Sequence, residues 1–470
     1  MLFNSFEFLI FFPAVCLIYF ILRGNKWRIP FLLIASYYFY MNWKPAYAIL
    51  ILTSTIITYF SGILIEKHDE KRTQKTFLTI SLVINFAILF VFKYFNFINE
   101  SVFHLLDCCG LRWNVPNLDV LLPVGISFYT FQAVGYSIDV YRGSIKAERR
   151  FTTYALFVSF FPQLVAGPIE RAKNLLPQFH EEHTFVYDDV IEGIKQMIWG
   201  FFMKLCVADI LSQYVDAVYN NIAFHNGTSL IIATIFFTFQ IYCDFGGYSN
   251  IAIGAARIMG FKLMENFHRP YLSLNINEFW KRWHISLSSW FKDYVYIPLG
   301  GNRVKQPRHM LNLMITFLVS GIWHGANWTF VVWGGLHGIY QVIAKIWNNH
   351  IGRISHKTIV YQLVSIAFCF ILVSFAWIFF RANTVNDAFL IINKIFTESG
   401  KPFFDIMVFV YGITALLILI IKDLKDEMDC KINFMHSRFI IIRYLSTIAL
   451  VAYILLFGSF ASDQFIYFQF

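Results

Sequence analysis

Long apolar runs separated by short polar connections make up most of this 470-residue chain. A run of about 20 apolar residues has the length of a helix that crosses a bilayer. The pattern therefore predicts an all-α polytopic membrane protein with roughly eleven membrane-embedded helices. The apolar runs fall at residues 6–22, 29–40, 47–65, 77–97, 120–138, 191–211, 229–261, 310–322, 328–347, 360–380, 403–421 and 440–460.

Basic residues gather in alternate connections between these runs. The connections at 23–28, 66–76 and 142–150 each carry several Lys or Arg, whereas 99–117 carries one, Arg112. Since Lys and Arg are retained on the cytoplasmic side, we expect an extracytoplasmic N-terminus. The first run has no small-residue cleavage site after it, so it is expected to be a retained span and not a signal peptide.

Composition supports the same class. Hydrophobic residues make up 57% of the chain and charged residues 14%, where a soluble domain carries about 25% charged residues. The net charge of +9 comes from basic residues dispersed among the spans, so it does not argue for nucleic acid. The seven cysteines form no CxxC pair and are expected to be small buried hydrophobes, with no metal site. His180 and His183, beside two glutamates, are read as a solvated loop.

His324 is the first candidate for catalysis, because polar groups inside apolar runs are expensive and raise a functional question. No acidic residue occurs between 306 and 341, so a neutral imidazole is the general base type available there. Gly321 and Gly325 flank the histidine and are expected to leave room for a thin substrate. The alternative is a buried histidine that serves packing. His337 would face nearly the opposite side of an unbroken helix, so a structural role is favoured for it unless Gly334–Gly335 breaks that helix.

The segment 275–291 is expected to form one amphipathic helix on the membrane surface. Asn275 and Glu278 resemble a capping box. An aromatic and apolar stripe follows at helical spacing, with the basic residues off that face. The stripe consists of Trp280, His284, Leu287 and Phe291, and the basic residues are Lys281, Arg282 and Lys292. His284 is either an interfacial anchor or a second polar group that reaches toward His324.

Asp244 interrupts another apolar run and is expected to form a structural ion pair with Arg257 or Arg282. The prolines and glycines of residues 161–171 predict irregular backbone at membrane depth, which is tolerated where it lies inside protein or lines a cavity. We expect one domain over 1–470, with its catalytic part at about 155–345. No nucleotide-binding or hydrolase motif is present.

Four segments together resemble the membrane-bound O-acyltransferase family. They are QLVAGP at 163–168, QIYCDFGGYS at 240–249, WHISLSSWFKDYVYIPLGG at 283–301 and GIWHGANW at 321–328. The resemblance is to the bacterial branch that includes alginate and peptidoglycan O-acetyltransferases and teichoic acid D-alanyltransferases. It covers nearly the whole chain, since both termini also look like this branch. Gly246 departs from the pattern, where a small polar residue is expected.

The resemblance implies a ring of membrane helices around a thin central tunnel in a bacterial cytoplasmic membrane. It makes His324 the invariant histidine and His284 the second catalytic histidine. Supporting residues around the tunnel would be Trp323, Gly325, Asn327, Trp328, Asp244, Gln240 and Trp283. It also implies an acyl thioester such as acetyl-CoA as donor substrate, with no bound cofactor. The acceptor would be an extracytoplasmic polysaccharide, often reached through a partner acyltransferase of the SGNH-hydrolase type.

Other readings stay open at this point. A transporter or flippase for lipid-linked sugar would explain many spans with buried polar groups, and a scaffold could recruit a partner enzyme. D-alanyl transfer to teichoic acid belongs to the same branch, but the extended region beyond Pro402 argues against it. Donors for the oxyanion of an acyl-transfer intermediate could be His284, Asn327 or backbone N–H groups near Gly321–Gly325. The acceptor polymer is left open by the sequence.

Overall fold

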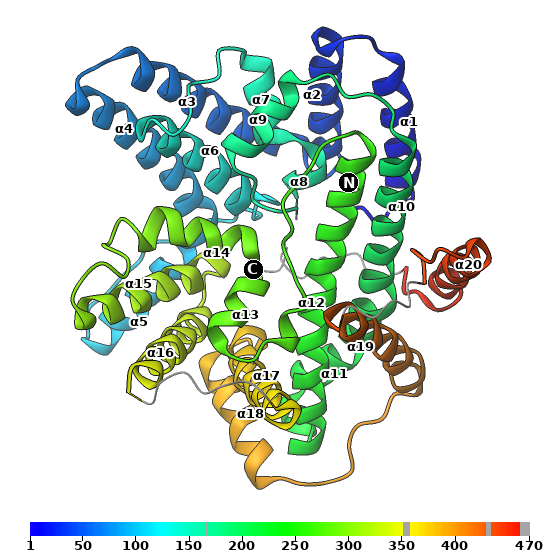
Figure 1. The fold of residues 1–470 in the computed structure, drawn as a ribbon. Coiled ribbons are helices and arrows are strands. Elements are labelled where there is room, and N and C mark those ends of the chain that lie inside the picture. The colour runs from blue at the N-terminus through cyan, green and yellow to red at the C-terminus, as the bar shows by residue number, and fades with distance from the viewer. Residues whose placement is uncertain (166, 351–357, 429–433, 461–470) are drawn as a thin grey trace. The chain divides into compact units, whose positions relative to one another are not determined.

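The computed structural model describes residues 1–165, 167–350, 358–428 and 434–460, and these residues form helices and connections without a strand. Chain contacts divide the molecule into two compact units. Unit 1 comprises residues 1–194 and 252–264, and unit 2 comprises 195–251 and 265–470. Figure 1 labels their helices. Each unit is described by itself.

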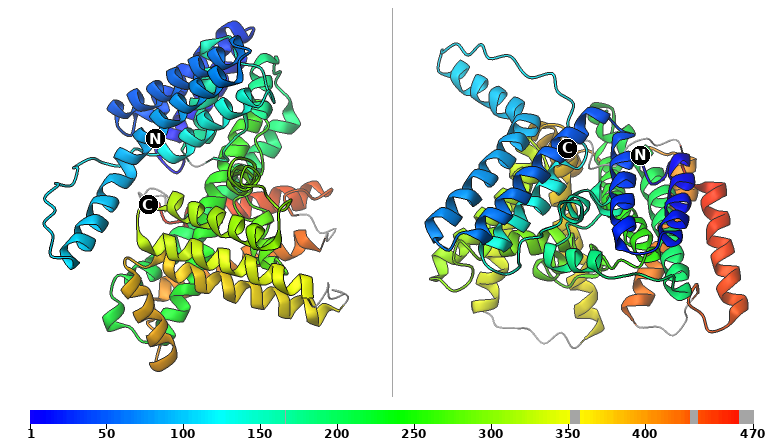
Figure 2. Two further views of the ribbon diagram at one scale, coloured as in Figure 1. Left: turned by 90° about the vertical axis from the view of Figure 1, so that its left-hand side faces the viewer. Right: turned by 90° about the horizontal axis from the view of Figure 1, so that it is seen from above.

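Unit 1 is a bundle of helices in which α3 lies against α4 and α6, and α2 lies against α7. Polar side chains pair in its interior, as in the bond from Tyr154 Oη to Thr58 Oγ1 of 2.7 Å. Figure 2 shows these helices side by side. The helices are α1 (Phe6–Ile21), α2 (Asn25–Met41), η1 (Pro45–Tyr47), α3 (Ala48–Lys67), α4 (Lys71–Leu89), η2 (Phe90–Tyr94), α5 (Phe95–Cys108), α6 (Ile126–Tyr141), α7 (Phe151–Ser159), α8 (Phe161–Leu164) and α9 (Ala172–His180).

Two helices, α10 (Tyr187–Phe201) and α12 (Gly227–Ile258), contribute residues to both units. The remaining elements belong to unit 2. They are η3 (Phe202–Ala208), α11 (Asp209–Tyr219), η4 (Ile222–Phe224), η5 (Pro270–Leu272), α13 (Ile276–Arg282), α14 (Ile285–Phe291), η6 (Lys292–Tyr296), α15 (Gln306–His324), α16 (Trp328–His350), α17 (Ile359–Arg381), α18 (Val385–Thr397), η7 (Val408–Gly412), α19 (Ile413–Glu427) and α20 (Ile440–Phe457).

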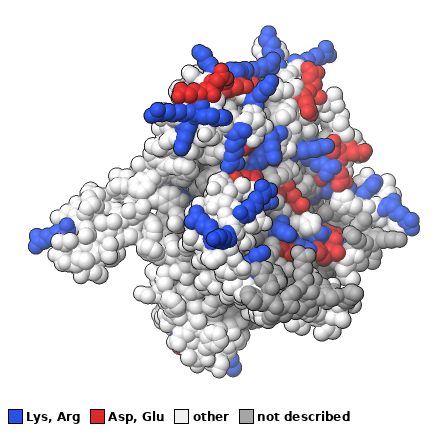
Figure 3. Space-filling view, turned by 60° about the vertical axis from the view of Figure 1, so that its left-hand side comes forward, with Lys and Arg blue, Asp and Glu red and all other residues white. Residues whose placement is uncertain are grey.

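Five of the described helical segments are long and apolar enough to cross a membrane. They are Pro45–Lys67, Lys71–Cys108, Gly227–Ile258, Ile359–Arg381 and Ile440–Phe457. Many large apolar side chains are exposed on these helices, as lipid contact requires, and Figure 3 shows wide surface areas without charge. The all-α membrane class is therefore confirmed, while the count of roughly eleven embedded helices stays a prediction.

The hairpin of α15 and α16 depends on two glycines at its closest approach. A Cβ atom on Gly321 would lie 2.3 Å from the Phe330 carbonyl oxygen, and one on Gly334 would lie 2.4 Å from the Phe317 oxygen. These glycines let two helix backbones touch, much as small residues do at other membrane helix contacts. The expectation that Gly321 makes room for substrate is thus wrong, because α16 fills that space. The helix break falls at 325–327 and not at Gly334.

The predicted single helix over 275–291 is wrong, since the chain forms two short helices, α13 and α14. Asn275 does cap α13, and its side chain accepts the Glu278 backbone N–H. The helix ends because Trp283 is extended, with φ −104° and ψ 127°. His284 then adopts a left-handed conformation with φ 43°, which is uncommon for a residue other than glycine. The backbone N–H of Ile285 then bonds to the Asn266 carbonyl at 2.9 Å and not to a carbonyl of α13. The predicted stripe is nevertheless buried at His284, Leu287 and Phe291.

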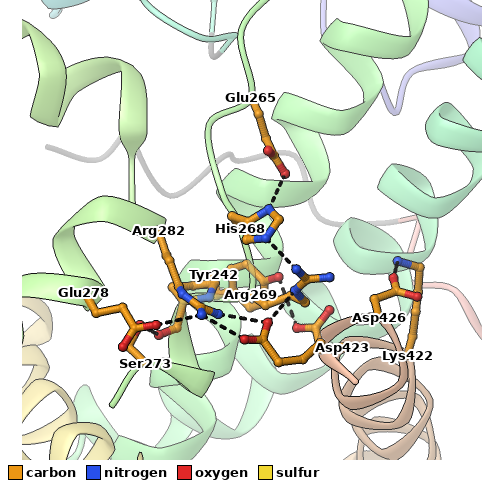
Figure 4. Close-up of polar contacts among 12 residues, drawn as sticks. Tyr242, Glu265, His268, Arg269, Ser273, Glu278, Arg282, Lys422, Asp423 and Asp426 are labelled. Carbon is orange, nitrogen blue, oxygen red and sulfur yellow. Dashed lines mark hydrogen bonds and ion pairs between the residues drawn. The ribbon is translucent and has the colours of Figure 1, made fainter. Parts of the chain in front are cut away.

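Ion pairs join α13 to α19 (Figure 4). Arg282 donates two hydrogen bonds to Glu427, at 2.9 and 2.8 Å, and a third to Glu278 at 2.7 Å. Arg269, in the segment before α13, pairs with the same Glu427 at 2.9 Å. Bonds from Arg282 lower the pKa of the Glu427 carboxyl. This cluster fixes the C-terminal end of α13, from which the chain continues directly to Trp283 and His284.

Candidate active site

Unit 2 brings the two predicted histidines together in its interior. His324 is the last residue of α15, and His284 lies between α13 and α14. Their ring centroids are 6.3 Å apart. Both side chains are buried, His284 fully. Forty residues of sequence separate them, so the fold of α13 to α15 creates this pair.

Aromatic rings form the walls around the two imidazoles. His324 contacts Trp333 at 4.9 Å and Phe380 at 5.5 Å between ring centroids. Trp323 contacts both histidines, at 6.1 Å from His284 and 5.0 Å from His324. Such walls exclude water and strengthen any charge interaction that develops between them.

His284 has a polar anchor that the sequence does not reveal. Its Nδ1 lies 3.0 Å from Asn266 Oδ1. The same oxygen accepts the Ser286 hydroxyl at 2.9 Å, and Asn266 Nδ2 donates to Ser249 Oγ at 3.1 Å. Asn266 and Ser286 are fully buried. In the sequence Asn266 is merely the start of a polar insert, and no spacing connects it with His284.

The setting of His284 favours the neutral imidazole. The residue lies outside the five candidate membrane spans. Burial lowers the pKa of its ring to about 3. At neutral pH the ring is therefore uncharged, and one nitrogen carries a lone pair that can accept a proton.

His337 is buried nearby on α16 but serves packing in this structure. Its ring lies 4.9 Å from that of Trp333. Its Nδ1 accepts the indole N–H of Trp280 at 3.3 Å. Trp333 stands between it and His324, with ring contacts to both. The structural role favoured for His337 agrees with this arrangement.

Three of the other predicted residues lie in or beside the turn between α15 and α16. Asn327 uses its side chain to bond Thr329 N and the Asn383 carbonyl, each at 3.0 Å, and Trp328 is exposed. Gly325 packs against Phe330, whose ring a Cβ atom would meet at 2.1 Å. These residues therefore shape the turn that follows His324.

Trp283 and Gln240 are buried supports. The Trp283 ring stacks on Phe279 at 5.5 Å and lies 5.1 Å from Trp377. Gln240 lies on α12, one turn before Asp244. Trp283 therefore belongs to the aromatic core beneath His284 and links α13 with α17.

The expected partners of Asp244 are wrong. Its carboxylate lies 2.6 Å from Lys204 Nζ, and Lys204 also pairs with Asp209 at 2.8 Å. All three side chains are buried. Arg257 instead pairs with Asp189, at 3.1 Å. The structural role predicted for Asp244 agrees with this cluster, in which α12 is tied to the π-helical turn η3.

A pocket of about 210 Å³ opens between α13, α14, α15 and α16. Its lining includes Trp280, Phe317 and Ser320, and Ser320 lies one helical turn before His324. Lys281 and Lys292 line it as well, and both are exposed. In the part of the chain that the structure describes, neither lysine has a carboxylate within ion-pairing distance. The pocket lining is thus largely apolar, with two exposed lysines at its rim.

The site can accept and move a proton in a dry aromatic environment. Among the described residues, no cluster of His, Cys, Asp and Glu side chains is suited to hold a metal ion. The chemical groups it offers are two buried imidazoles whose ring centroids lie 6.3 Å apart, with their planes tilted by 60°.

Comparison with known proteins decides the family. The sequence model of the membrane-bound O-acyltransferase family, MBOAT, matches residues 149–382. The chain is 38% identical to the probable alginate O-acetylase of Pseudomonas aeruginosa over 401 residues, which are 84% of this chain and 75% of that protein. The chain belongs to the membrane-bound O-acyltransferase family. It is therefore an enzyme, and the transporter and scaffold readings are set aside.

Two other members of the family show how far the likeness extends. A peptidoglycan O-acetyltransferase of Helicobacter pylori is 34% identical over 433 residues, 85% of this chain and 80% of that protein. A teichoic acid D-alanyltransferase of Streptococcus thermophilus is 32% identical over 241 residues, 48% of this chain and 57% of that protein. The stretch matched by the family model contains both histidines and Asn266.

Proposed function

We propose that this membrane-bound O-acyltransferase takes an acetyl group from a cytoplasmic thioester and passes it toward an extracytoplasmic hydroxyl. That hydroxyl belongs to a cell-surface polysaccharide or to a partner acyltransferase of the SGNH type. The names of the relatives support acetyl over D-alanyl transfer, because the two named for O-acetylation align with 84% and 85% of the chain and the D-alanyltransferase with 48%. The observation that carries the proposal is the buried pair of His324 and His284.

The reaction needs one proton acceptor and no redox partner. The acceptor oxygen attacks the thioester carbonyl carbon, a C–O bond forms, and the C–S bond breaks. His324 takes the proton from the hydroxyl and returns it to the leaving thiolate, so that an ester and a thiol result.

The pocket beside α15 supports a thioester carried by a thin, phosphate-bearing arm. Acetyl-CoA has this form, and its phosphates would meet Lys281 and Lys292 at the rim while the arm lies against Trp280 and Phe317. Ser320 would then mark the inner end of the route, one turn from His324. We expect the acetyl group to arrive at His324 from this side.

Labelled acetyl transfer from acetyl-CoA in reconstituted vesicles tests the function. His324→Ala should lower transfer by at least about a hundredfold, as loss of a general base does, with normal protein levels in the vesicles. His225→Ala is the control, because this histidine lies in the connection before α12 and its ring packs on Phe403, outside the aromatic walls described around His324. Near-normal transfer by His324→Ala would refute the role of His324. Transfer of D-alanine but not of acetyl would assign the chain to the other activity.

A further inference from the structure

His284 has two possible neutral tautomers, and they have opposite chemistry. With hydrogen on Nδ1, the Nε2 atom accepts hydrogen bonds and protons. With hydrogen on Nε2, that atom donates and could stabilise an oxyanion. Which nitrogen carries the hydrogen is set by the partner of the other nitrogen. The partner of Nδ1 here is Asn266, at 3.0 Å.

The hydrogen bonds around Asn266 identify which of its atoms faces His284. The backbone N–H of Ser286 points at the same atom, at 3.4 Å. A backbone N–H donates and cannot accept, so that atom is the amide oxygen. The amide NH₂ then faces Ser249 Oγ, which can accept it at 3.1 Å. This assignment satisfies the buried amide on both sides, and its flipped form would set two donors against each other.

We propose that Asn266 is a positioning residue that holds His284 with hydrogen on Nδ1 and a lone pair on Nε2, so that His284 acts as an acceptor at the His324 site. The amide oxygen requires a donor from Nδ1, and the ring has one hydrogen while it is neutral. His284 is then no donor for the oxyanion. The inference rests on the proposed function, in which both histidines serve one acyl transfer.

His337 shows that the unit does not impose this tautomer on every buried histidine. Its Nδ1 accepts from the Trp280 indole, which has no lone pair to offer, so the hydrogen of His337 is on Nε2. The two histidines are both fully buried. The difference between them comes from the partner of Nδ1, an amide oxygen in one and an N–H in the other.

Burial leaves Asn266 little freedom to change partner. Its side chain is held from α12 by Ser249 and from α14 by Ser286, and its carbonyl accepts the Ile285 N–H at 2.9 Å. The same contacts hold the backbone of His284 in its left-handed conformation. One asparagine therefore fixes both the backbone and the ring hydrogen of this histidine.

The described ring contacts of His284 come mainly from aromatic side chains. The titratable side chain whose ring contacts His284 is His324, from α15, at 6.3 Å. Phe245 from α12 and Phe267 from the loop that follows α12 pack on His284, with ring centroids at 4.6 and 6.2 Å. A carboxylate introduced at position 266 would thus be the charge closest to Nδ1 among the described contacts. It would favour the imidazolium and raise the pKa of His284.

The test is the pH dependence of acetyl transfer in Asn266 variants of the full chain, in vesicles. Asn266→Asp keeps an oxygen acceptor at Nδ1, so it should retain activity within about tenfold at high pH. Its acid limb should move upward by at least about one pH unit, because a charge in contact shifts a pKa by that much. Asn266→Ala should lower kcat by about tenfold or more at every pH, with the KM for acetyl-CoA unchanged.

Asn312→Ala is the matched control, because Asn312 is also fully buried in unit 2 and donates to the Gly301 carbonyl at 3.1 Å. It should leave the acid limb in place. An acid limb of Asn266→Asp that coincides with wild type, or wild-type kcat in Asn266→Ala, would overturn the inference. If Asn266→Ala fails to insert into the membrane, the position of the acid limb in Asn266→Asp alone tests the inference. Inactivity of the wild type toward acetyl-CoA would count against the proposed function and not against the role of Asn266.

Discussion

At the residue scale, His284 and His324 are expected to act as one unit. Their imidazoles meet at 6.3 Å inside the same aromatic walls, and groups that serve one transition state have effects that do not add. His284→Ala should weaken acetyl transfer, and adding it to His324→Ala should lower transfer little further. The measurement is a double-mutant cycle at matched membrane levels. Fully additive losses of activity would show that the two histidines act independently. Wild-type activity in His284→Ala would show that His284 is only an interfacial anchor.

Both catalytic candidates could be predicted from the sequence, because an ionisable side chain in an apolar or aromatic stretch is conspicuous by itself. Their supporting contacts could not. Asn266 precedes His284 in a polar loop where an asparagine is ordinary, and only the chain reversal through η5 and α13 brings the two together. The sequence predicts an arginine as the partner of Asp244, but Lys204 reaches it from η3. Which cation is nearest depends on helix packing that residue types do not encode.

At the element scale, the α15–α16 hairpin should tolerate a methyl group at one glycine and not at another. Gly321→Ala places Cβ 2.3 Å from a backbone oxygen of α16, so the helices must separate. We expect a loss of about 1–3 kcal/mol in stability and lower transfer, since α15 ends at His324. Gly335→Ala is the matched control, with Leu318 at 3.8 Å as its nearest neighbour. Equal thermal midpoints of the two variants in detergent would contradict this account.

The rim of the pocket gives a second prediction at this scale. Lys281→Ala combined with Lys292→Ala should raise the KM for acetyl-CoA with little change in kcat, because the lysines would bind donor phosphates far from the reacting carbon. Lys305→Ala, an exposed lysine before α15, is the control. The measurement is the KM for acetyl-CoA at low and at moderate ionic strength. The rise in KM should be smaller at the higher ionic strength, because salt screens the lysine charges. An unchanged KM would remove these lysines from the donor route.

The break between α13 and α14 shows why element boundaries resisted prediction. The periodicity of the stripe was right, since His284, Leu287 and Phe291 are buried. The continuity was wrong because the backbone N–H of Ile285 bonds a loop carbonyl in place of an earlier carbonyl of α13. The spacing of apolar residues indicates which side chains face the interior. The path of the backbone depends on hydrogen bonds to residues far away in the sequence, which that spacing does not indicate.

At the scale of the whole molecule, the orientation in the bilayer is open to a simple test. Cys108 and Cys109 are exposed at the end of α5, in the connection predicted to be extracytoplasmic. Cys206, Cys243 and Cys369 are buried. A membrane-impermeant maleimide should therefore label right-side-out vesicles and lose most of that signal in a Cys108→Ser, Cys109→Ser variant. Stronger labelling of these positions in inverted vesicles would reverse the predicted topology.

The class and family of the molecule could be predicted from hydropathy and four motifs, but its core could not. Apolar runs reveal what can enter a bilayer and say little about which helices touch. The short elements α13 and α14 carry too few apolar residues to register as spans, yet His284, Leu287 and Phe291 are as deeply buried as the core of α17. A search for apolar runs of bilayer length does not detect short segments that are surrounded by protein and not by lipid.

The charge cluster at Lys204 also bears on how the chain is delivered into the bilayer during synthesis. Asp244 lies in the middle of a span, and a lone carboxylate at that depth costs about 2.5–3.5 kcal/mol during translocon-mediated insertion. Lys204 leaves the ribosome first, closely followed by one counter-charge, Asp209, and the second counter-charge, Asp244, follows 40 residues after Lys204. If the segment with Lys204 waits beside the insertion machinery, both segments enter the bilayer together, with the Lys204–Asp244 ion pair already formed. The two segments would then insert as a helical hairpin. If translation stopped between them, the segment with Lys204 would remain at the membrane surface and would not insert.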